Sequence, residues 1–138
     1  MVDRRIIAEK VDAAQRNINR IENRRGEAFE TFNSSEDVQD IVILHLMQAV
    51  QNCVDLASHI VTDEELGLAS STRDFFYILS ESKIISSDLR EKMIKAVGFR
   101  NLAAHEYAKL DLQEVYNIAT HGINDLKEFV GVIVRRFA

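Results

Sequence analysis

An arginine, a histidine and a tyrosine lie within the eight residues RNLAAHEY, numbers 100–107 of the chain. A neutral imidazole can take or give a proton near neutral pH, because its unperturbed pKa is about 6.5. A guanidinium can bind phosphate oxygens through two hydrogen bonds as charge builds on them. Phosphodiester cleavage uses both groups, and in RNA the 2′-hydroxyl is a built-in nucleophile. Arg100 and His105 therefore have the chemistry needed to cleave RNA without a metal.

The spacing of these residues creates a geometric problem on a regular helix. Arg100 and Tyr107 would lie within about 20° of each other around the helix axis, whereas Arg100 and His105 would diverge by about 140°. Either the helix frays near Ala104 and lets His105 swing round, or a second copy of the chain supplies the complementary group. Small neighbouring residues leave room for another segment to approach closely.

The same residues also have an interpretation without catalysis. Arg100 and Glu106 could be ordinary surface charges, with His105 near a helix C-terminus, where the helix dipole favours a cation. Tyr107 could pack its ring against the protein and form a hydrogen bond through its hydroxyl. Residue types and spacing alone leave both interpretations open.

The elements that would position these residues are all predicted to be helices. The chain has no proline, five glycines, and no Asn-Gly or Asp-Gly turn between alternating runs, so hairpins have little support. Apolar periodicity predicts helices at about 3–32, 36–62, 72–83, 88–105 and 112–136. Gly26 is expected to bend or end the first helix. We predict an all-α fold, an antiparallel bundle of four to five helices.

The residues predicted to face the core share the three- and four-residue spacing of one helix face. They are Ile7, Val11, Ala14, Ile18, Ile21, Ala28 and Phe32; Phe75, Phe76 and Leu79; Leu89, Met93, Ala96 and Val97; and Val115, Ile118, Ile123, Leu126, Phe129 and Val130. Arg25 takes an apolar position of the first helix.

Polar residues before the helices are predicted caps. Ser34 with Asp37 resembles a capping pair for the second helix, and Ser86 or Ser87 can cap the fourth. Asp111 with Glu114 is a plausible reciprocal cap for the fifth, whose β-branched tail VGVIVRRF has the lowest helix propensity.

Length and composition favour one domain, residues 1–138, in the cytoplasm. At 138 residues and 46% apolar content the chain can bury a single core. The start MVDRRIIAEK lacks the apolar stretch of a signal peptide, and the densest apolar run, Ile41 to Met47, is too short to span a membrane. The single Cys53 cannot form an internal disulfide and is expected to be a buried, inert thiol.

The net charge of −5 is unevenly distributed. Residues 1–25 sum to +3, residues 26–69 to −9 with no basic group, residues 70–110 to +2 and residues 111–138 to −1. A protein that coats nucleic acid needs a broad basic face, which this chain lacks. Any RNA chemistry must therefore use a few cations in a cleft. The acidic segment 26–69 either serves a basic partner or is a solvated surface.

Other candidate sites are weaker. Asp55 and His59 are four residues apart and could lie beside the cleft, although an ordinary contact between neighbouring helical turns is the favoured interpretation. There is no H-E-x-x-H or multi-cysteine pattern. We expect neither a metal nor a cofactor.

The pattern R-x-x-x-x-H-x-Y, with Asn101 directly after the arginine, resembles the signature of the HEPN superfamily, and specifically of HepT-like toxins. The similarity extends beyond the motif, in the family's order, to DLASHI at 55–60, FFYILSESKIIS at 75–86, VGFRNLAAHEY at 97–107 and LQEVYNI at 112–118. Residues 1–32 match only as an amphipathic helix.

The resemblance implies a HEPN-like domain that dimerises, with two motifs facing each other across a cleft that acts as a metal-independent endoribonuclease. By this similarity Arg100 would stabilise the RNA phosphate, His105 would be the acid/base, and Asn101 would orient them. It also implies a type VII toxin–antitoxin pair, in which a MntA-like nucleotidyltransferase antitoxin silences the toxin by transferring AMP to Tyr107. The alternative function is a non-catalytic helical module that binds a nucleotide or a nucleotidyltransferase partner.

Overall fold

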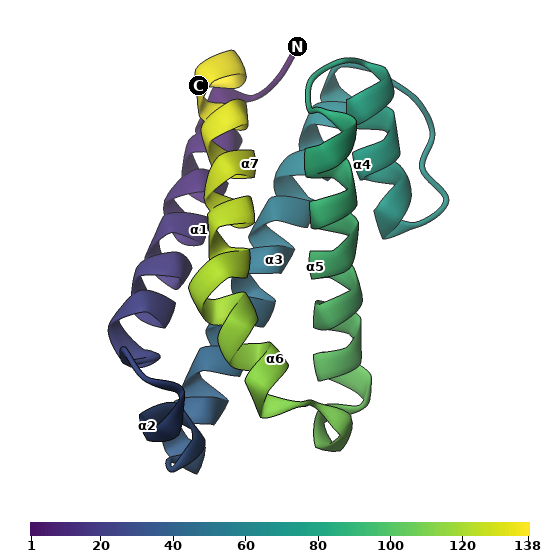
Figure 1. Cartoon of the computed structure of the whole chain (residues 1–138). Helices are drawn as coiled ribbons and strands as arrows, with labels where there is room; N and C mark the ends of the chain where they lie inside the picture. The colour runs from purple at the N-terminus through teal and green to yellow at the C-terminus, as the bar shows by residue number, and fades with distance from the viewer.

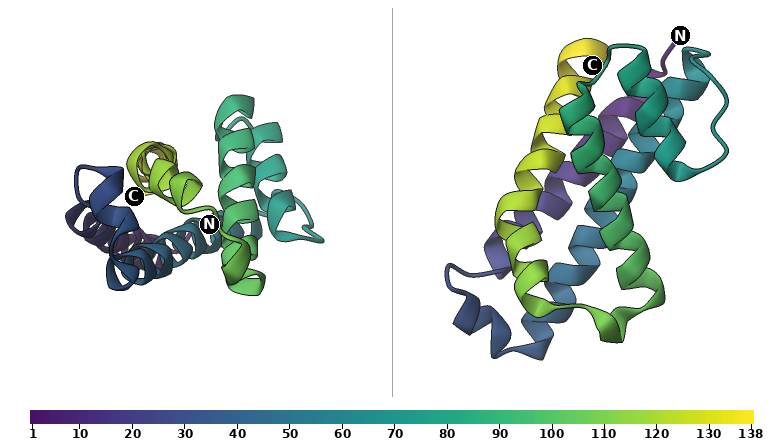
Figure 2. Two further views of the ribbon diagram at one scale, coloured as in Figure 1. Left: turned by 60° about the horizontal axis from the view of Figure 1, so that its bottom comes forward. Right: turned by 45° about the vertical axis from the view of Figure 1, so that its right-hand side comes forward.

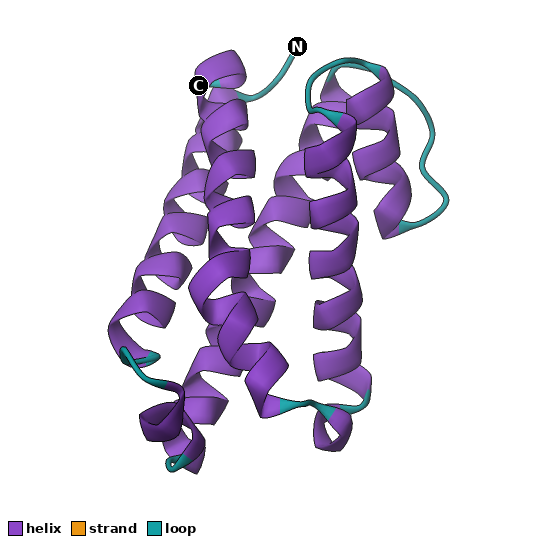
Figure 3. Cartoon of the chain, viewed as in Figure 1, coloured by secondary structure: helices purple, strands orange, loops and turns teal.

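Four long helical runs pass up and down the molecule, and no strand is present (Figures 1 and 3). The computed structural model describes residues 1–138. In chain order the elements are α1 (Arg4–Arg24), α2 (Phe29–Asn33), α3 (Glu36–Asp63), α4 (Thr72–Glu81), α5 (Ser87–His105), the 3₁₀ turn η1 (Tyr107–Lys109), α6 (Leu112–Asn117), the π-helical turn η2 (Ile118–Gly122) and α7 (Ile123–Phe137). The predicted all-α antiparallel bundle is confirmed.

The long helix α3 lies at the centre of the bundle. It contacts α1, α4, α5 and α7, while α1 and α5 each also pack against α7. The short α4 packs against α3 and α5 at one edge, and both chain termini lie at the same end (Figures 1 and 2). A single cluster of 34 buried apolar residues fills the space between these helices. The opposite end holds the turn from α5 into η1 (Figure 1).

The predicted first helix is interrupted before its end. Instead of one helix to residue 32, α1 ends at Arg24 and α2 starts at Phe29. Gly26 lies between them with φ of +74°, a left-handed conformation that ends a helix and favours glycine. Because the chain turns there, Ala28 is exposed and Phe32 reaches the core from α2.

The last predicted helix is continuous but irregular. Its residues form α6, η2 and α7, and the β-branched tail is helical through Phe137. The π turn shifts the inward face by one position, so that Ala119 is fully buried and Ile118 only half-buried. Arg25 Nη1 donates a hydrogen bond of 2.6 Å to the Ala119 carbonyl, which explains a charged residue at an apolar position.

Serine and aspartate caps fix the starts of α3, α5 and α6. The predicted cap of α3 was wrong by one residue, because Ser35, and not Ser34, accepts the Val38 N–H at 3.3 Å. Ser86 caps α5 by accepting the Leu89 N–H at 3.1 Å. Asp111 caps α6 by accepting the Gln113 N–H at 3.0 Å.

Helix α3 is long and apolar enough to cross a membrane by length and composition alone. Its most apolar 18-residue window has a mean hydropathy of 1.3, and half of that window is buried inside the fold. The buried core helix of a soluble protein meets the same criterion, so this finding is weak evidence for a membrane span.

Candidate functional site

The motif residues Arg100, Asn101 and His105 all lie on one unbroken helix. α5 is regular from Ser87 to His105, and the Glu106 N–H closes its last turn with a hydrogen bond of 2.7 Å to the Leu102 carbonyl. The helix therefore does not fray at Ala104, and that explanation of the motif geometry is wrong. Arg100 and His105 point about 140° apart around a single axis.

Arg100 is held in one orientation by two acceptors. Its Nη1 donates to Asn101 Oδ1 at 2.8 Å, and its Nη2 donates to Gln51 Oε1 on the neighbouring α3. All three side chains are half-buried. The guanidinium is thus fixed before any ligand binds, and its remaining N–H groups are available to an anion.

The hydrogen bonds on Arg100 continue across two more helices. Gln51 Nε2 donates to Asp55 Oδ1 at 2.9 Å, and Lys10 Nζ on α1 donates to Asp55 Oδ2 at 3.1 Å. A polar chain therefore links α1, α3 and α5. Asp55 pairs with Lys10 and Gln51, not with His59 as the four-residue spacing suggested. Sequence reasoning missed Gln51 and Lys10. Gln51 stands four residues before Asp55 on α3, but only the packing of helices brings Lys10 to Asp55 and Gln51 to Arg100.

His105 is placed very differently from Arg100. It is the last residue of α5, its side chain is exposed, and it forms no hydrogen bond within the chain. An exposed imidazole at a helix C-terminus is free to exchange protons with solvent or with a bound molecule.

Tyr107 lies beyond the end of α5, in the single turn η1. Its predicted position within 20° of Arg100 is therefore wrong, since that angle assumed a continuous helix. The Tyr107 hydroxyl donates a hydrogen bond to Asp40 Oδ1 on α3, and 47% of the residue is exposed. Partial burial, the hydrogen bond to Asp40, and the charges of Asp40 and Glu36 raise the pKa of Tyr107 to about 12. Asp40 belongs to the acidic segment 26–69, and no local pattern of residues indicated this contact.

Cys53 is a structural residue of the core. It is fully buried, and burial followed by the charge of Asp55 raises the pKa of its thiol to about 12. The thiol is therefore protonated and inert at neutral pH, as predicted. No group of three or more His, Cys, Asp or Glu side chains is arranged to hold a metal ion.

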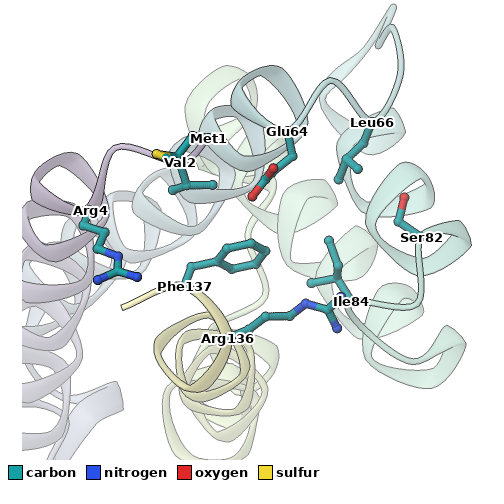
Figure 4. Close-up of a pocket in the computed structure, with 9 residues that line it drawn as sticks. All are labelled: Met1, Val2, Arg4, Glu64, Leu66, Ser82, Ile84, Arg136 and Phe137. Atoms are coloured by element: carbon teal, nitrogen blue, oxygen red, sulfur yellow. The ribbon is translucent and has the colours of Figure 1, made fainter.

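The larger hollows of the surface do not contain the motif side chains. One of about 430 Å³ lies where the two termini meet, and Arg4, Arg136, Glu64 and Phe137 are among its lining residues (Figure 4). Another, of about 670 Å³, runs between α5 and the α6–α7 run and is lined by Gly98, Phe99 and Leu102 among others. Arg100, Asn101, His105 and Tyr107 line neither of these two hollows.

Comparisons with known proteins agree with the fold and with the family resemblance. The family model of HepT-like ribonucleases matches residues 14–133. The mRNA nuclease HepT of Shewanella oneidensis is 35% identical over 128 residues, which cover 93% of this chain and 96% of that protein.

Solved structures give the same result. A tri-AMPylated Shewanella oneidensis HEPN toxin in complex with its MNT antitoxin superposes with a TM-score of 0.90 at 34% identity, covering 99% of this chain and 100% of that one. A toxin–antitoxin complex with AMP-PNP gives a TM-score of 0.90 at 34% identity, covering 95% of this chain and 98% of that one. The Bacillus subtilis cytosolic protein YutE, at 16% identity and a TM-score of 0.83, shares the fold, covering 97% of this chain and 90% of that one. On the match over residues 14–133 and the identity to HepT, the chain belongs to the HepT-like ribonucleases of the HEPN superfamily.

Proposed function

We propose that this chain is the toxin of a type VII toxin–antitoxin pair, a metal-independent endoribonuclease that works in the cytoplasm. The observation that supports it most directly is the fixed guanidinium of Arg100 on the same unbroken helix as the exposed, unpaired His105. The relatives support the same assignment, since one is named an mRNA nuclease and others are toxins bound to antitoxins.

The proposed reaction needs a cation at the phosphate and two proton carriers, one on each side of the scissile bond. Arg100 binds the non-bridging phosphate oxygens, and Asn101 and Gln51 hold it in place. His105 takes the proton of the 2′-hydroxyl, whose oxygen attacks the phosphorus. The bond from phosphorus to the 5′-oxygen breaks, and His105 of a second copy of the chain gives this oxygen a proton. The products are a 2′,3′-cyclic phosphate and a 5′-hydroxyl.

A homodimer would bring the required groups together. Because α5 is regular through His105, one chain cannot turn Arg100 and His105 to one face. The surface of α5 has features suited to a partner, since Leu102 is exposed and a side chain at Gly98 would meet no atom within 4 Å. Light scattering at micromolar concentration is expected to give the mass of two chains, and a monomer mass would contradict the shared cleft.

Cleavage of RNA by the purified protein in EDTA is the direct test of activity. His105→Ala should abolish cleavage because it removes the proton carrier, and Arg100→Ala should do so because it removes the side chain that binds the phosphate. His121→Ala is the matched control, since His121 is also exposed but lies on η2, outside the motif. Cleavage by His105→Ala at the wild-type rate would contradict the assignment. Absence of cleavage by the wild type would favour the non-catalytic binding module.

Silencing is proposed to occur by AMP transfer to Tyr107. A MntA-like nucleotidyltransferase with ATP and Mg²⁺ would add AMP to the hydroxyl and so place a negative phosphodiester and a base beside the motif. Intact-mass spectrometry after co-expression should show additions in AMP-sized steps on the wild type and none on Tyr107→Phe. Tyr77→Phe is the control, since Tyr77 is also exposed but lies under Arg90. An unmodified chain that is nevertheless silenced would indicate inhibition by tight binding.

A further inference from the structure

Two carboxylates of α3 act on the hydroxyl of Tyr107, one by direct contact and one through its charge. Asp40 accepts the hydrogen bond from that hydroxyl, and Glu36 acts on Tyr107 through its charge. The two are four residues apart and so share one face of the helix. Neither residue has a role in the proposed RNA cleavage, and both belong to the acidic segment 26–69.

A tyrosine hydroxyl is a poor nucleophile until its proton leaves. With a pKa of about 12, Tyr107 is ionised in only about one molecule in 10⁵ at pH 7. Transfer of a nucleotide to this oxygen therefore needs a base that takes the proton as the new bond forms. Asp40 is the only side chain in this protein that forms a hydrogen bond with the Tyr107 hydroxyl.

We infer that Asp40 is the general base for AMP transfer to Tyr107. The inference rests on the proposed modification of Tyr107. In the step, the Tyr107 O–H bond breaks and its proton passes to Asp40 Oδ1. The phenolic oxygen bonds to the α-phosphorus of Mg²⁺-bound ATP. The bond from that phosphorus to the α,β-bridging oxygen breaks, and pyrophosphate leaves with the electron pair.

The placement of the two residues suits this role. Asp40 is exposed, Tyr107 is its only hydrogen-bond partner, and it projects from a long helix that Val42 and Ile43 anchor in the core. Tyr107 lies on a single 3₁₀ turn with about half its surface exposed. A nucleotide can therefore approach the phenolic oxygen from solvent while Asp40 contacts it from the protein side. In protein kinases an aspartate accepts the proton of the substrate hydroxyl in the same way.

The test measures AMP transfer in a single turnover, with saturating MntA-like partner, ATP and Mg²⁺, by intact-mass spectrometry. Asp40→Asn keeps the size of the side chain and its hydrogen-bond acceptor but cannot take the proton, so the rate should fall about 100-fold or more. Asp40→Glu should recover part of the rate. Asp40→Ala should be slow and should speed up when formate, a small diffusible base, is added.

Glu36→Gln is the matched control, because it removes a nearby negative charge without removing a hydrogen bond to Tyr107. Its rate should stay within a few-fold of the wild type, and partner affinity should be unchanged in all variants. Transfer to Asp40→Asn at the wild-type rate would overturn the inference, as would weaker partner binding with a normal rate at saturation. Both of those outcomes leave the wild type modified, whereas an unmodified wild type would contradict the proposed modification itself and the inference with it.

Discussion

Arg100 and His105 lie five residues apart on one helix, yet their surroundings are opposite. Arg100 is half-buried and donates to Asn101 and Gln51, whereas His105 is exposed and has no partner within the chain. The difference is consistent with the tasks proposed for them. A side chain that binds phosphate works best when its orientation is fixed before the substrate arrives. A proton carrier must instead stay accessible to the groups between which it moves protons.

Arg100 and His105 also differ in the side-chain entropy that remains to be lost when a ligand binds. An arginine side chain has about 2 kcal/mol of rotamer entropy, which is lost when it is ordered. Here folding removes part of that freedom through the contacts to Gln51 and Asn101, so binding of the proposed RNA substrate need not do so. His105, with fewer rotatable bonds, loses less when a second molecule orders it.

The largest expected effect separates activity from stability. Arg100→Ala and His105→Ala should each lower RNA cleavage by about 10²-fold or more. Only Arg100→Ala should also lower the free energy of unfolding, by about 1–2 kcal/mol, because it leaves half-buried Gln51 without its donor. Urea unfolding measures this difference. Equal stability losses in the two variants would contradict the contrast between a supported and an unsupported residue.

A smaller effect is expected at Gln51, which orients Arg100 and has no direct role in the proposed reaction. Gln51→Met keeps the length of the side chain but removes its hydrogen bonds to Arg100 and Asp55. Single-turnover cleavage at saturating RNA should fall about 10-fold, corresponding to about 1.4 kcal/mol. Gln48→Met, at an exposed position on the same helix, should cleave normally. If Gln51→Met cleaves at the wild-type rate, Arg100 does not depend on α3 for its orientation.

The sequence predicted those parts of the fold that depend on local signals. The ends of α3 and α5 lie within one residue of their predicted positions, because serine caps and apolar periodicity act over three or four residues. The break near Gly26 was expected only as a bend or end, and the π turn was not expected. Arg25 contacts the Ala119 carbonyl across 94 residues of sequence, and no local pattern records such a contact.

The candidate site shows the same limit. Residue types and the family resemblance predicted Arg100, Asn101, His105 and Tyr107 as site residues, and these four stay predictions. The residues that contact them from α3 were not found, since Gln51 and Asp40 meet the motif 49 and 67 residues away in the chain. A glutamine and an aspartate on a helix surface have no distinctive spacing, and only tertiary packing brings them to Arg100 and Tyr107.

Lys10 tests how far the support of Arg100 extends. Its ammonium contacts Asp55, and both side chains are about one-third exposed. An ion pair this accessible to solvent contributes about 0.2–1 kcal/mol. Lys10→Met should therefore lower cleavage by no more than a few-fold, and the difference from wild type should shrink at high salt. A loss of cleavage as large as that of Gln51→Met would show that the hydrogen-bonded side chains from Lys10 to Arg100 act as one unit.

The smallest effect concerns Tyr107, whose surroundings are intermediate between those of Arg100 and His105. It is half exposed like a surface residue, but it has one fixed partner, Asp40. Its pKa is raised from 10.0 to about 12 in the folded chain, so the unfolded state loses this proton first as the pH rises. The contribution of Tyr107 to stability is therefore complete below about pH 10 and is lost as the pH rises towards about 12. Because the side chain is accessible to solvent, the loss should be under about 1 kcal/mol.

The difference in unfolding free energy between wild type and Tyr107→Phe, measured at about pH 9 and about pH 11, should shrink with pH. Phenolate absorbance of the same two proteins should place the ionisation of Tyr107 above that of a free tyrosine, and Asp40→Asn should lower it. An ordinary pKa for Tyr107 in the wild type would mean that the contact with Asp40 is too transient in solution to distinguish Tyr107 from the unsupported His105.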